Sequence, residues 1–318
     1  RLRSRGLGDV YKRQVYRSTG YYQNFSDAHN LMSYRHTRAH NSLLVNGIGQ
    51  PYSTEGYGSV TRAMGGQHIS YCLGDVSHAY RGISNDPMWV GYFKQAGIEQ
   101  TPENGFGATP LTKYRRHVLM LHPHTVIVYD ELEASEAVRW EWLLHSPTEF
   151  KMDVTKKTLS TNNKTQGWVA VTQLFGGHVF TLSQTDRFVV PPAITGAEYP
   201  NQWHLTARVD GCSATRFLAI IQVGDEAVPI INRDGDTFNV GDWTIKAVLD
   251  ASKAPELAVS HRTEQAVFSY GTDNPALNGN FYSRQYTGSS LLYDEIDGAY
   301  QVVEMTDRSP ISTRVVNQ

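Results

Sequence analysis

The sequence predicts an all-β fold, a large antiparallel β-sandwich (supersandwich) followed by a smaller C-terminal β region. Three observations support this prediction. Short runs rich in β-branched and aromatic residues recur from about residue 117 onward, and turn residues separate them. Helical 3.6-residue periodicity with capping residues is hard to find anywhere in the chain. The chain also contains 18 Tyr, 6 Trp and 11 Phe, and aromatic residues suit cross-strand packing.

The predicted strands follow one another at short intervals. We expect them at residues 117–121, 125–132, 138–146, 168–175, 178–184, 204–209, 216–223, 244–249, 266–271 and 300–305. Gly176-Gly177 joins two of these runs and predicts a tight hairpin with a primed turn.

Residues 81–113 differ from the strand-rich part, because Pro, Gly and Asn punctuate them without periodicity. A loop of this length in a compact domain is usually functional or mobile. Strand density falls again near residues 246–265. We therefore predict a β-sandwich over residues 15–250 and a smaller C-terminal β region over residues 251–318.

Residues 1–14, RLRSRGLGDVYKRQ, lack an initiator Met and the apolar stretch of a secretory signal. Residues 9–14 can be back-translated into a sequence that resembles the adapter of transposon-based sequencing libraries. We therefore interpret residues 1–14 as a translated adapter artefact, with native sequence from about Val15. The alternative is a basic N-terminal arm, which five Lys and Arg residues support only weakly.

The overall composition argues against two classes of partner. With 29 basic and 31 acidic residues the net charge is −2, which gives no broad electrostatic attraction for nucleic acid or an anionic membrane. No apolar run approaches the length of a membrane span. Cys72 and Cys212 could form one disulfide or stay as two thiols, so the redox compartment is open.

Histidines are concentrated in the first part of the chain, where eight of the twelve lie between residues 29 and 124. In SYRHTRAHNSLLVNGIGQ, the run SLLV before Asn46-Gly47 predicts a strand that enters a turn. If the preceding segment is also extended, alternation puts His36, Arg38 and His40 on one face. Such a face could bind an anionic substrate or a metal.

Six pieces of the sequence together carry a family resemblance. They are STGYY (18–22), DAH (27–29), YRHTRAHNSLLVNGIGQ (34–50), GDVSHAY (74–80), YRRHVLMLHPHTVIVYDELEA (114–134) and WEWLLHS (140–146). In this order and spacing they resemble the β-sandwich part of the heparinase II/III-like polysaccharide lyases. The resemblance covers roughly the first 130 native residues.

The resemblance implies a reaction and a missing domain. These lyases cleave uronic-acid polysaccharides by β-elimination, and in the family an N-terminal α/α toroid forms the other wall of the active-site cleft. That toroid, which is absent here, supplies the group that neutralises the substrate carboxylate and a principal Tyr. The implied partners are an acidic polysaccharide or oligosaccharide, the missing toroid domain and a possible second copy in a homodimer. The fragment is then expected to be nearly inactive, and the parent protein to be periplasmic or extracellular.

The resemblance also implies catalytic residues. Tyr80 matches a cleft-facing Tyr of the heparinase II branch. Arg38 stands where that branch has the sandwich His, and an Arg can bind a carboxylate but cannot act as a base near neutral pH. His36 is the candidate that could take over proton transfer.

A structural zinc ion is the cofactor that the resemblance implies. His40 and His117 match two family histidines that bind it. The acidic ligand of the family has no clear counterpart, because the best spacing falls on His68 and the nearest downstream carboxylate is Asp75. Three histidines would still be sound zinc ligation.

Two other functions are open from the sequence. The chain could be a non-catalytic carbohydrate-binding or structural β-sandwich, in which aromatic residues bind glycan. It could also be a zinc hydrolase that uses His40, His68 and His117, although no neighbouring carboxylate stands out as its general base.

Overall fold

The computed structural model describes residues 15–308, except for residues 164–167, 195–198, 225–227 and 278–279. The described chain is mainly β, and all its strand pairs are antiparallel. The predicted all-β class is therefore confirmed.

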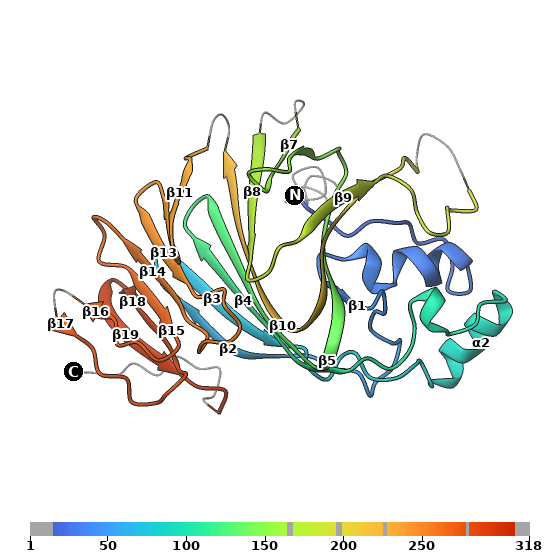
Figure 1. Cartoon of the computed structure of the whole chain (residues 1–318), viewed down its shortest axis with the longest axis horizontal. Coiled ribbons are helices and arrows are strands. Elements are labelled where there is room, and N and C mark those ends of the chain that lie inside the picture. Colours follow the sequence, from blue (N-terminus) through green and yellow to red (C-terminus); the bar gives the residue numbers. More distant parts are fainter. Residues whose placement is uncertain (1–14, 164–167, 195–198, 225–227, 278–279, 309–318) are drawn as a thin grey trace, which may run out of the picture.

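Ten strands of the described chain form a first sheet (Figure 1). Its order is β2 (Ser59–Gly65), β3 (Ile69–Asp75), β4 (Leu111–Leu121), β5 (Thr125–Ser146), β10 (Trp203–Gly224), β8 (Trp168–Gly176), β7 (Thr158–Asn163) and β6 (Lys151–Asp153). Two further strands join at the sides, β1 (Leu43–Val45) on β5 and β9 (Thr181–Thr185) on β10.

Seven strands form a second sheet, again counted over the described residues. Its order is β11 (Ile231–Asp234), β12 (Thr237–Val240), β13 (Trp243–Ala247), β14 (Leu257–His261), β15 (Val267–Tyr270), β18 (Ser290–Ile296) and β19 (Ala299–Met305); β16 (Ala276–Leu277) and β17 (Asn280–Phe281) make a separate ribbon. The predicted boundary after residue 250 lies in the connection between β13 and β14, which are neighbours in this sheet. The division into two domains stays a prediction.

Helical segments gather at the end of the molecule opposite the second sheet (Figure 1). They are η1 (Asn30–Tyr34), η2 (Thr37–Ala39), α2 (Pro87–Gln95) and η3 (Pro102–Asn104). α2 lies in the region that we expected to be a loop. The Asp86 carboxylate caps it by accepting from the backbone of Met88 and Trp89, and Pro87 occupies the first turn. The sequence carried this capping signal, but a nine-residue helix is too short to show a clear period.

β5 and β10 are each 22 residues long, and each contains two of the runs that we expected as separate strands. The pairing of β10 with β5 shifts register between Val209 and Ala214. Gly211 lies in this interval with a φ of +72°, and glycine adopts such a φ without strain. The polar residues that indicated a break therefore mark a bulge within one strand.

Gly176 and Gly177 do not form the predicted hairpin. β8 and β9 both pair with β10, at residues 217–224 and 204–208, so they lie end to end along one side of it. A Cβ on Gly177 would lie 2.1 Å from the carbonyl oxygen of Leu249. Gly177 is therefore needed because the chain after β13 approaches the first sheet closely, and not because of a turn.

The turn predicted at Asn46-Gly47 is confirmed. Both residues have positive φ, 56° and 81°, and Val45 and Ile48 exchange two backbone hydrogen bonds across them. These are the features of a type I′ hairpin turn.

Two hydrophobic cores lie on opposite faces of the first sheet. Along β10, Leu218 and Ile220 pack in the core between the two sheets, whereas Phe217 and Ala219 pack in a second core on the other face. Side chains alternate along a strand, so one strand can serve both cores. The first sheet is consequently buried on both sides over much of β5 and β10.

The structure shows the state of the two cysteines and the lengths of the helices. Cys72 and Cys212 are free thiols, on β3 and β10 respectively. Within the described residues no helix is both long and apolar enough to cross a membrane.

Replacing Gly177 with Ala should lower the free energy of unfolding by about 1–3 kcal/mol, because the added methyl group overlaps a backbone carbonyl. Gly91 gives the matched control, because it is exposed in the middle of α2 and an added Cβ would meet no atom within 4 Å. Gly91→Ala should instead stabilise by about 0.5–1 kcal/mol. Urea unfolding of both variants measures the difference, and equal stabilities would contradict the close approach.

Candidate functional site

The segment that carries His36, Arg38 and His40 is not extended. It contains the 3₁₀ turn η2, and the His36 side chain caps this turn by accepting from the backbone N–H of Arg38 at 3.1 Å. The three side chains therefore do not share one strand face, contrary to the expectation from alternation.

His36 is fully buried and neutral. Its Nδ1 accepts from Nε of Arg38 at 3.0 Å, and its Nε2 lies 3.0 Å from the carbonyl oxygen of Gly105. Burial, reinforced by the charge of Arg38, lowers the pKa of His36 to about 3. His36 thus orients Arg38, and its ring does not line either of the two hollows described next.

His40 lines the larger hollow of this end of the molecule, which has a volume of about 590 Å³. Its Nδ1 lies 2.7 Å from the hydroxyl of Ser18. Burial lowers the pKa of His40, which favours the neutral imidazole at physiological pH. The volume lies within the usual range of ligand pockets.

Aromatic residues and one cation also line this hollow. Tyr34, Tyr52 and Trp89 line it together with Arg35. Trp89 comes from α2, and its ring centroid lies 5.1 Å from that of Tyr52. A small core of Leu31, Met32, Phe93 and Phe106 holds η1 against α2. Residues 81–113 thus contribute to the lining of this hollow, through a helix that we did not predict.

A pair of histidines that the sequence analysis gave no role lies beside this segment. His145 on β5 and His204 on β10 are directly paired in register, and their ring centroids are 5.1 Å apart. Nε2 of His145 lies 2.8 Å from the carbonyl oxygen of Arg38, so His145 holds the backbone of the site segment. Burial lowers the pKa of His145 to about 3 and that of His204 to about 4. Both line a smaller hollow of about 130 Å³ that Arg38 also lines.

No local signal in the sequence could have found this pair, because 58 residues separate the two histidines. Only the register of β5 against β10 brings them together. Asn41 also contacts this pair, because its side-chain oxygen accepts from the backbone N–H of His145 at 2.8 Å.

A buried ion pair fixes Asn41. Arg116 binds Asp130 through two hydrogen bonds of 2.7 and 2.8 Å, and it also donates to the carbonyl oxygen of Asn41 at 2.6 Å. Asp130 accepts a further bond from the indole of Trp142 at 3.0 Å. The pair therefore anchors the chain directly after His40 to the first sheet.

Tyr80 does not face the site. Its ring is 1% exposed, and its hydroxyl donates to the carbonyl oxygen of Leu43 at 2.6 Å. Burial raises its pKa. Tyr80 is therefore buried against β1, to which its hydroxyl is bonded. The expected role of Tyr80 at a cleft surface does not agree with this buried position.

The three histidines expected to bind zinc do not meet. His117 on β4 lies opposite Leu73 of the neighbouring strand. His68 precedes Leu73 by five residues, so it is displaced from His117 by about 16 Å along the strand direction. His68 is bonded to Asp294 at 2.6 Å, and His40 to Ser18. The alternative ligand Asp75 accepts from the backbone of Ser77. No group of three metal-binding side chains occurs in the described part of the chain, so the expected residues do not fit one zinc ion.

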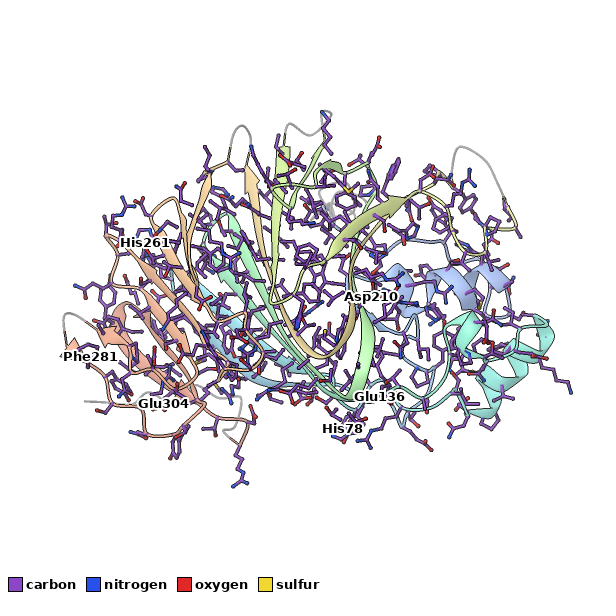
Figure 2. The ribbon with its side chains drawn as sticks, viewed as in Figure 1. His78, Glu136, Asp210, His261, Phe281 and Glu304 are labelled. Atoms are coloured by element: carbon purple, nitrogen blue, oxygen red, sulfur yellow. The ribbon has the colours of Figure 1, made fainter. Side chains whose placement is uncertain are left out.

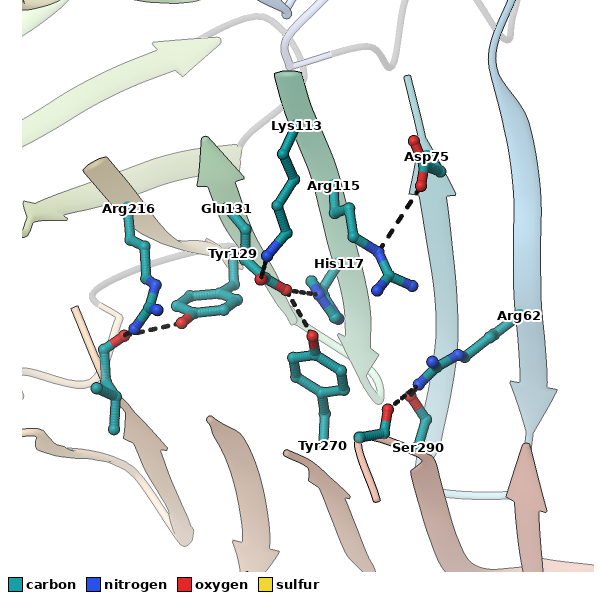
Figure 3. A network of polar contacts seen from close by, with 12 residues as sticks. Arg62, Asp75, Lys113, Arg115, His117, Tyr129, Glu131, Arg216, Tyr270 and Ser290 are labelled. Carbon is teal, nitrogen blue, oxygen red and sulfur yellow. Dashed lines mark hydrogen bonds and ion pairs between the residues drawn. The ribbon is translucent and has the colours of Figure 1, made fainter. Parts of the chain in front are cut away.

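His117 belongs instead to a polar network between the two sheets (Figure 3). Its Nε2 lies 2.9 Å from Oε1 of Glu131, and its Nδ1 lies 3.0 Å from the hydroxyl of Tyr71. Glu131 also accepts from Tyr270 of the second sheet at 2.8 Å and pairs with Lys113 at 2.7 Å. Burial raises the pKa of Glu131, but His117 and Lys113 lower it more, so the net pKa lies well below its usual value.

The chain matches one known protein family. Residues 10–177 match the family described as "Heparinase II/III-like, C-terminal". No curated protein matches the chain.

Three solved structures are similar to the chain at low sequence identity. A Heparinase III-BT4657 gene product has 13% identity and a TM-score of 0.49, over 80% of this chain and 33% of that one. Heparan sulfate lyase HepC from Pedobacter heparinus has 12% identity and a TM-score of 0.48, over 76% and 32%. A structure titled Heparinase III has 14% identity and a TM-score of 0.49, over 84% and 32%. The chain spans about a third of the length of these structures.

Removing Glu131 should test the inter-sheet network. Glu131→Ala leaves His117, Tyr270 and Lys113 without their common acceptor, and loss of one partner of a buried charge pair typically costs about 3–5 kcal/mol. Glu133, whose side chain is 51% exposed and binds the same Lys113, is the matched control. Glu133→Ala should change stability by less than about 1 kcal/mol. Urea unfolding at pH 7 compares the two, and a similar small loss in both would contradict a structural role for the network.

The buried histidines should make stability depend on pH. The pKa of His36 is about 3 in the folded chain, against about 6.5 when unfolded. Below pH 6.5 the unfolded state therefore binds more protons than the folded state, and the free energy of unfolding decreases as the pH is lowered. His36→Gln should make the loss of stability between pH 7 and pH 5 smaller by about 2 kcal/mol.

The exposed His78 provides the control, because His78→Gln also removes an imidazole but at a position without the burial of His36. Urea unfolding at both pH values gives the slopes. NMR titration of the His36 ring in the unmodified chain is an independent check, and a ring that titrates near pH 6.5 would refute the assignment.

Proposed function

Because this chain belongs to the heparinase II/III-like family, we propose that it forms the sandwich wall of the active site of a polysaccharide lyase. The substrate class is an acidic, uronic-acid-containing polysaccharide of the glycosaminoglycan type. The observation that carries the proposal is the larger hollow, in which a neutral His40 lies beside Arg35 and three aromatic side chains.

The chemistry of β-elimination explains why such a lining is suitable. A base removes the proton at C5 of the uronate, the electron pair forms the C4–C5 double bond, and the C4–O4 bond breaks while an acid protonates O4. Charge that develops on the carboxylate has to be stabilised by cations or hydrogen-bond donors. A neutral imidazole can accept or return a proton near pH 7, and aromatic faces bind the apolar faces of sugar rings.

His40 is the proton-transfer residue of this wall in our proposal. His36 is excluded from that role, because it is buried beneath the surface and bonded to Arg38 and Gly105. Arg38 is positioned by His36 and by the carbonyl oxygen of Asn104 at 2.7 Å. Arg38 therefore acts as a fixed cation that lines the smaller hollow.

The remaining groups of the reaction come from the rest of the enzyme in this proposal. The chain spans about a third of the solved lyases to which it is similar. We propose that the toroid domain supplies the opposite wall, and that the chain alone binds acidic oligosaccharides without cleaving them. We also propose that the whole enzyme works in the periplasm or outside the cell.

The test is binding of a uronic-acid oligosaccharide, such as a heparan sulfate fragment, by calorimetry. Trp89→Ala should weaken binding about tenfold, which corresponds to about 1.4 kcal/mol, because it removes an aromatic face of the hollow. Phe281, which is 81% exposed at the opposite end of the molecule (Figure 2), is the control, and Phe281→Ala should leave binding unchanged.

Parallel absorbance measurements follow formation of the unsaturated uronate. No growth of this signal is expected from the chain alone, and appreciable growth would show that the chain is a complete catalyst. Absence of binding by the unmodified chain would contradict the proposed cleft wall. Binding that Trp89→Ala does not weaken would place the glycan surface elsewhere and favour a binding module of another kind.

A further inference from the structure

Arg35 is held in an unusual setting within the larger hollow. It follows η1 directly, and its backbone N–H donates to the carbonyl oxygen of Asn30 at 2.9 Å. Its guanidinium carbon lies 5.1 Å from the ring centroid of Trp89, 5.2 Å from that of Phe25 and 5.8 Å from that of Tyr22. Rings at these distances attract the cation and restrict its motion. The head of Arg35 is therefore positioned before any ligand arrives.

The charge of Arg35 has no counter-ion in the described chain. No carboxylate lies within 4.0 Å of its nitrogens there, and its Nε is buried without a hydrogen-bond partner. Asp86 lines the same hollow, and its Oδ1 accepts the two bonds that cap α2, but no ion pair joins its carboxylate to Arg35. A buried donor without a partner is costly, typically about 1–3 kcal/mol, unless a ligand satisfies it.

The geometry of an arginine side chain limits what that ligand can be. A guanidinium presents parallel N–H donors that match a carboxylate or a sulfate ester, and such charge-assisted bonds are stronger than neutral ones. The hollow also offers the hydroxyl of Ser18 and the ring of His40, bonded to each other at 2.7 Å. A sugar that carries an acidic group would thus find a cation, aromatic faces and neutral polar groups together.

We infer that Arg35, held by Trp89, Phe25 and Tyr22, binds the acidic group of one sugar residue and determines selectivity for charged over neutral glycans. The inference rests on the proposed function, because it assigns a role within the same hollow. Carboxylate and sulfate ester share the chemistry that Arg35 would bind, and the experiment separates them.

The experiment measures calorimetric affinity for three oligosaccharides of equal length. The first is an unsulfated uronate oligosaccharide, the second has its carboxylates reduced to alcohols, and the third is sulfated but carboxyl-reduced. The unmodified chain should bind at least one charged form about tenfold or more tightly than the neutral form, as expected for a charge-assisted bond pair. Arg35→Gln should reduce that ratio to near one. Preference for the first form identifies a carboxylate, and preference for the third identifies a sulfate ester.

Two further variants keep the result interpretable. Arg35→Lys retains a cation among the rings and should keep only part of the preference, so it reports on Arg35 even if Arg35→Gln folds poorly. Arg233 lies 5.5 Å and 5.3 Å from the rings of Phe175 and Phe238, and Arg233→Gln is the matched control that should keep the full ratio.

The outcomes distinguish this inference from the proposed function. If the unmodified chain prefers charged glycans and both Arg35 variants keep the full ratio, the inference is wrong while the proposed function stands. If the unmodified chain binds no acidic oligosaccharide, both are wrong. If it binds charged and neutral forms equally, Arg35 is not a determinant of selectivity.

Discussion

The antiparallel pairing of β5 with β10 is the constraint on which the rest of the structure depends. Their register runs from Thr125 opposite Gln222 to Ser146 opposite Trp203, broken only by the irregular interval around Gly211. One end of this ladder lies under the second sheet and the other end carries the paired histidines of the site. Because side chains alternate along both strands, the same ladder supplies both hydrophobic cores. A change of one residue in register would exchange the two faces, and would thus disrupt the cores and the site together.

Two neighbouring carboxylates on β5 illustrate how the faces are coupled. Asp130 points to one side, where Arg116 links it to Asn41 next to the site, and Glu131 points to the other, where His117 and Tyr270 link it to the second sheet. Both are at most 1% exposed. Buried charges are costly unless they are paired and hydrogen-bonded, and here each carboxylate accepts several bonds. Their main effect is to fix how the site segment and the second sheet sit on β5.

The site combines neutral histidines with cations that have no carboxylate partner in the described chain. Burial keeps His36, His40, His145 and His204 largely uncharged. The guanidinium of Arg35 lies among aromatic rings, and that of Arg38 donates to a neutral carbonyl oxygen. Cations without an ion-pair partner favour the binding of anions, although one carboxylate, that of Asp86, also lines the larger hollow. The same lack of internal counter-ions supports both the proposed acidic substrate and the role of Arg35.

The sequence by itself determined the all-β class and the turn at Asn46-Gly47, and it singled out the segment around His40 that lines the candidate site, because strand alternation, turn preferences and short motifs are local properties. Only the tertiary structure decided which distant residues meet. It paired His145 with His204, buried Tyr80 under β1, kept His68 about 16 Å from His117 along the sheet, and used Gly177 for a close approach instead of a turn. Strand partners and register are set by the burial of whole faces, and no local pattern of residues records that choice.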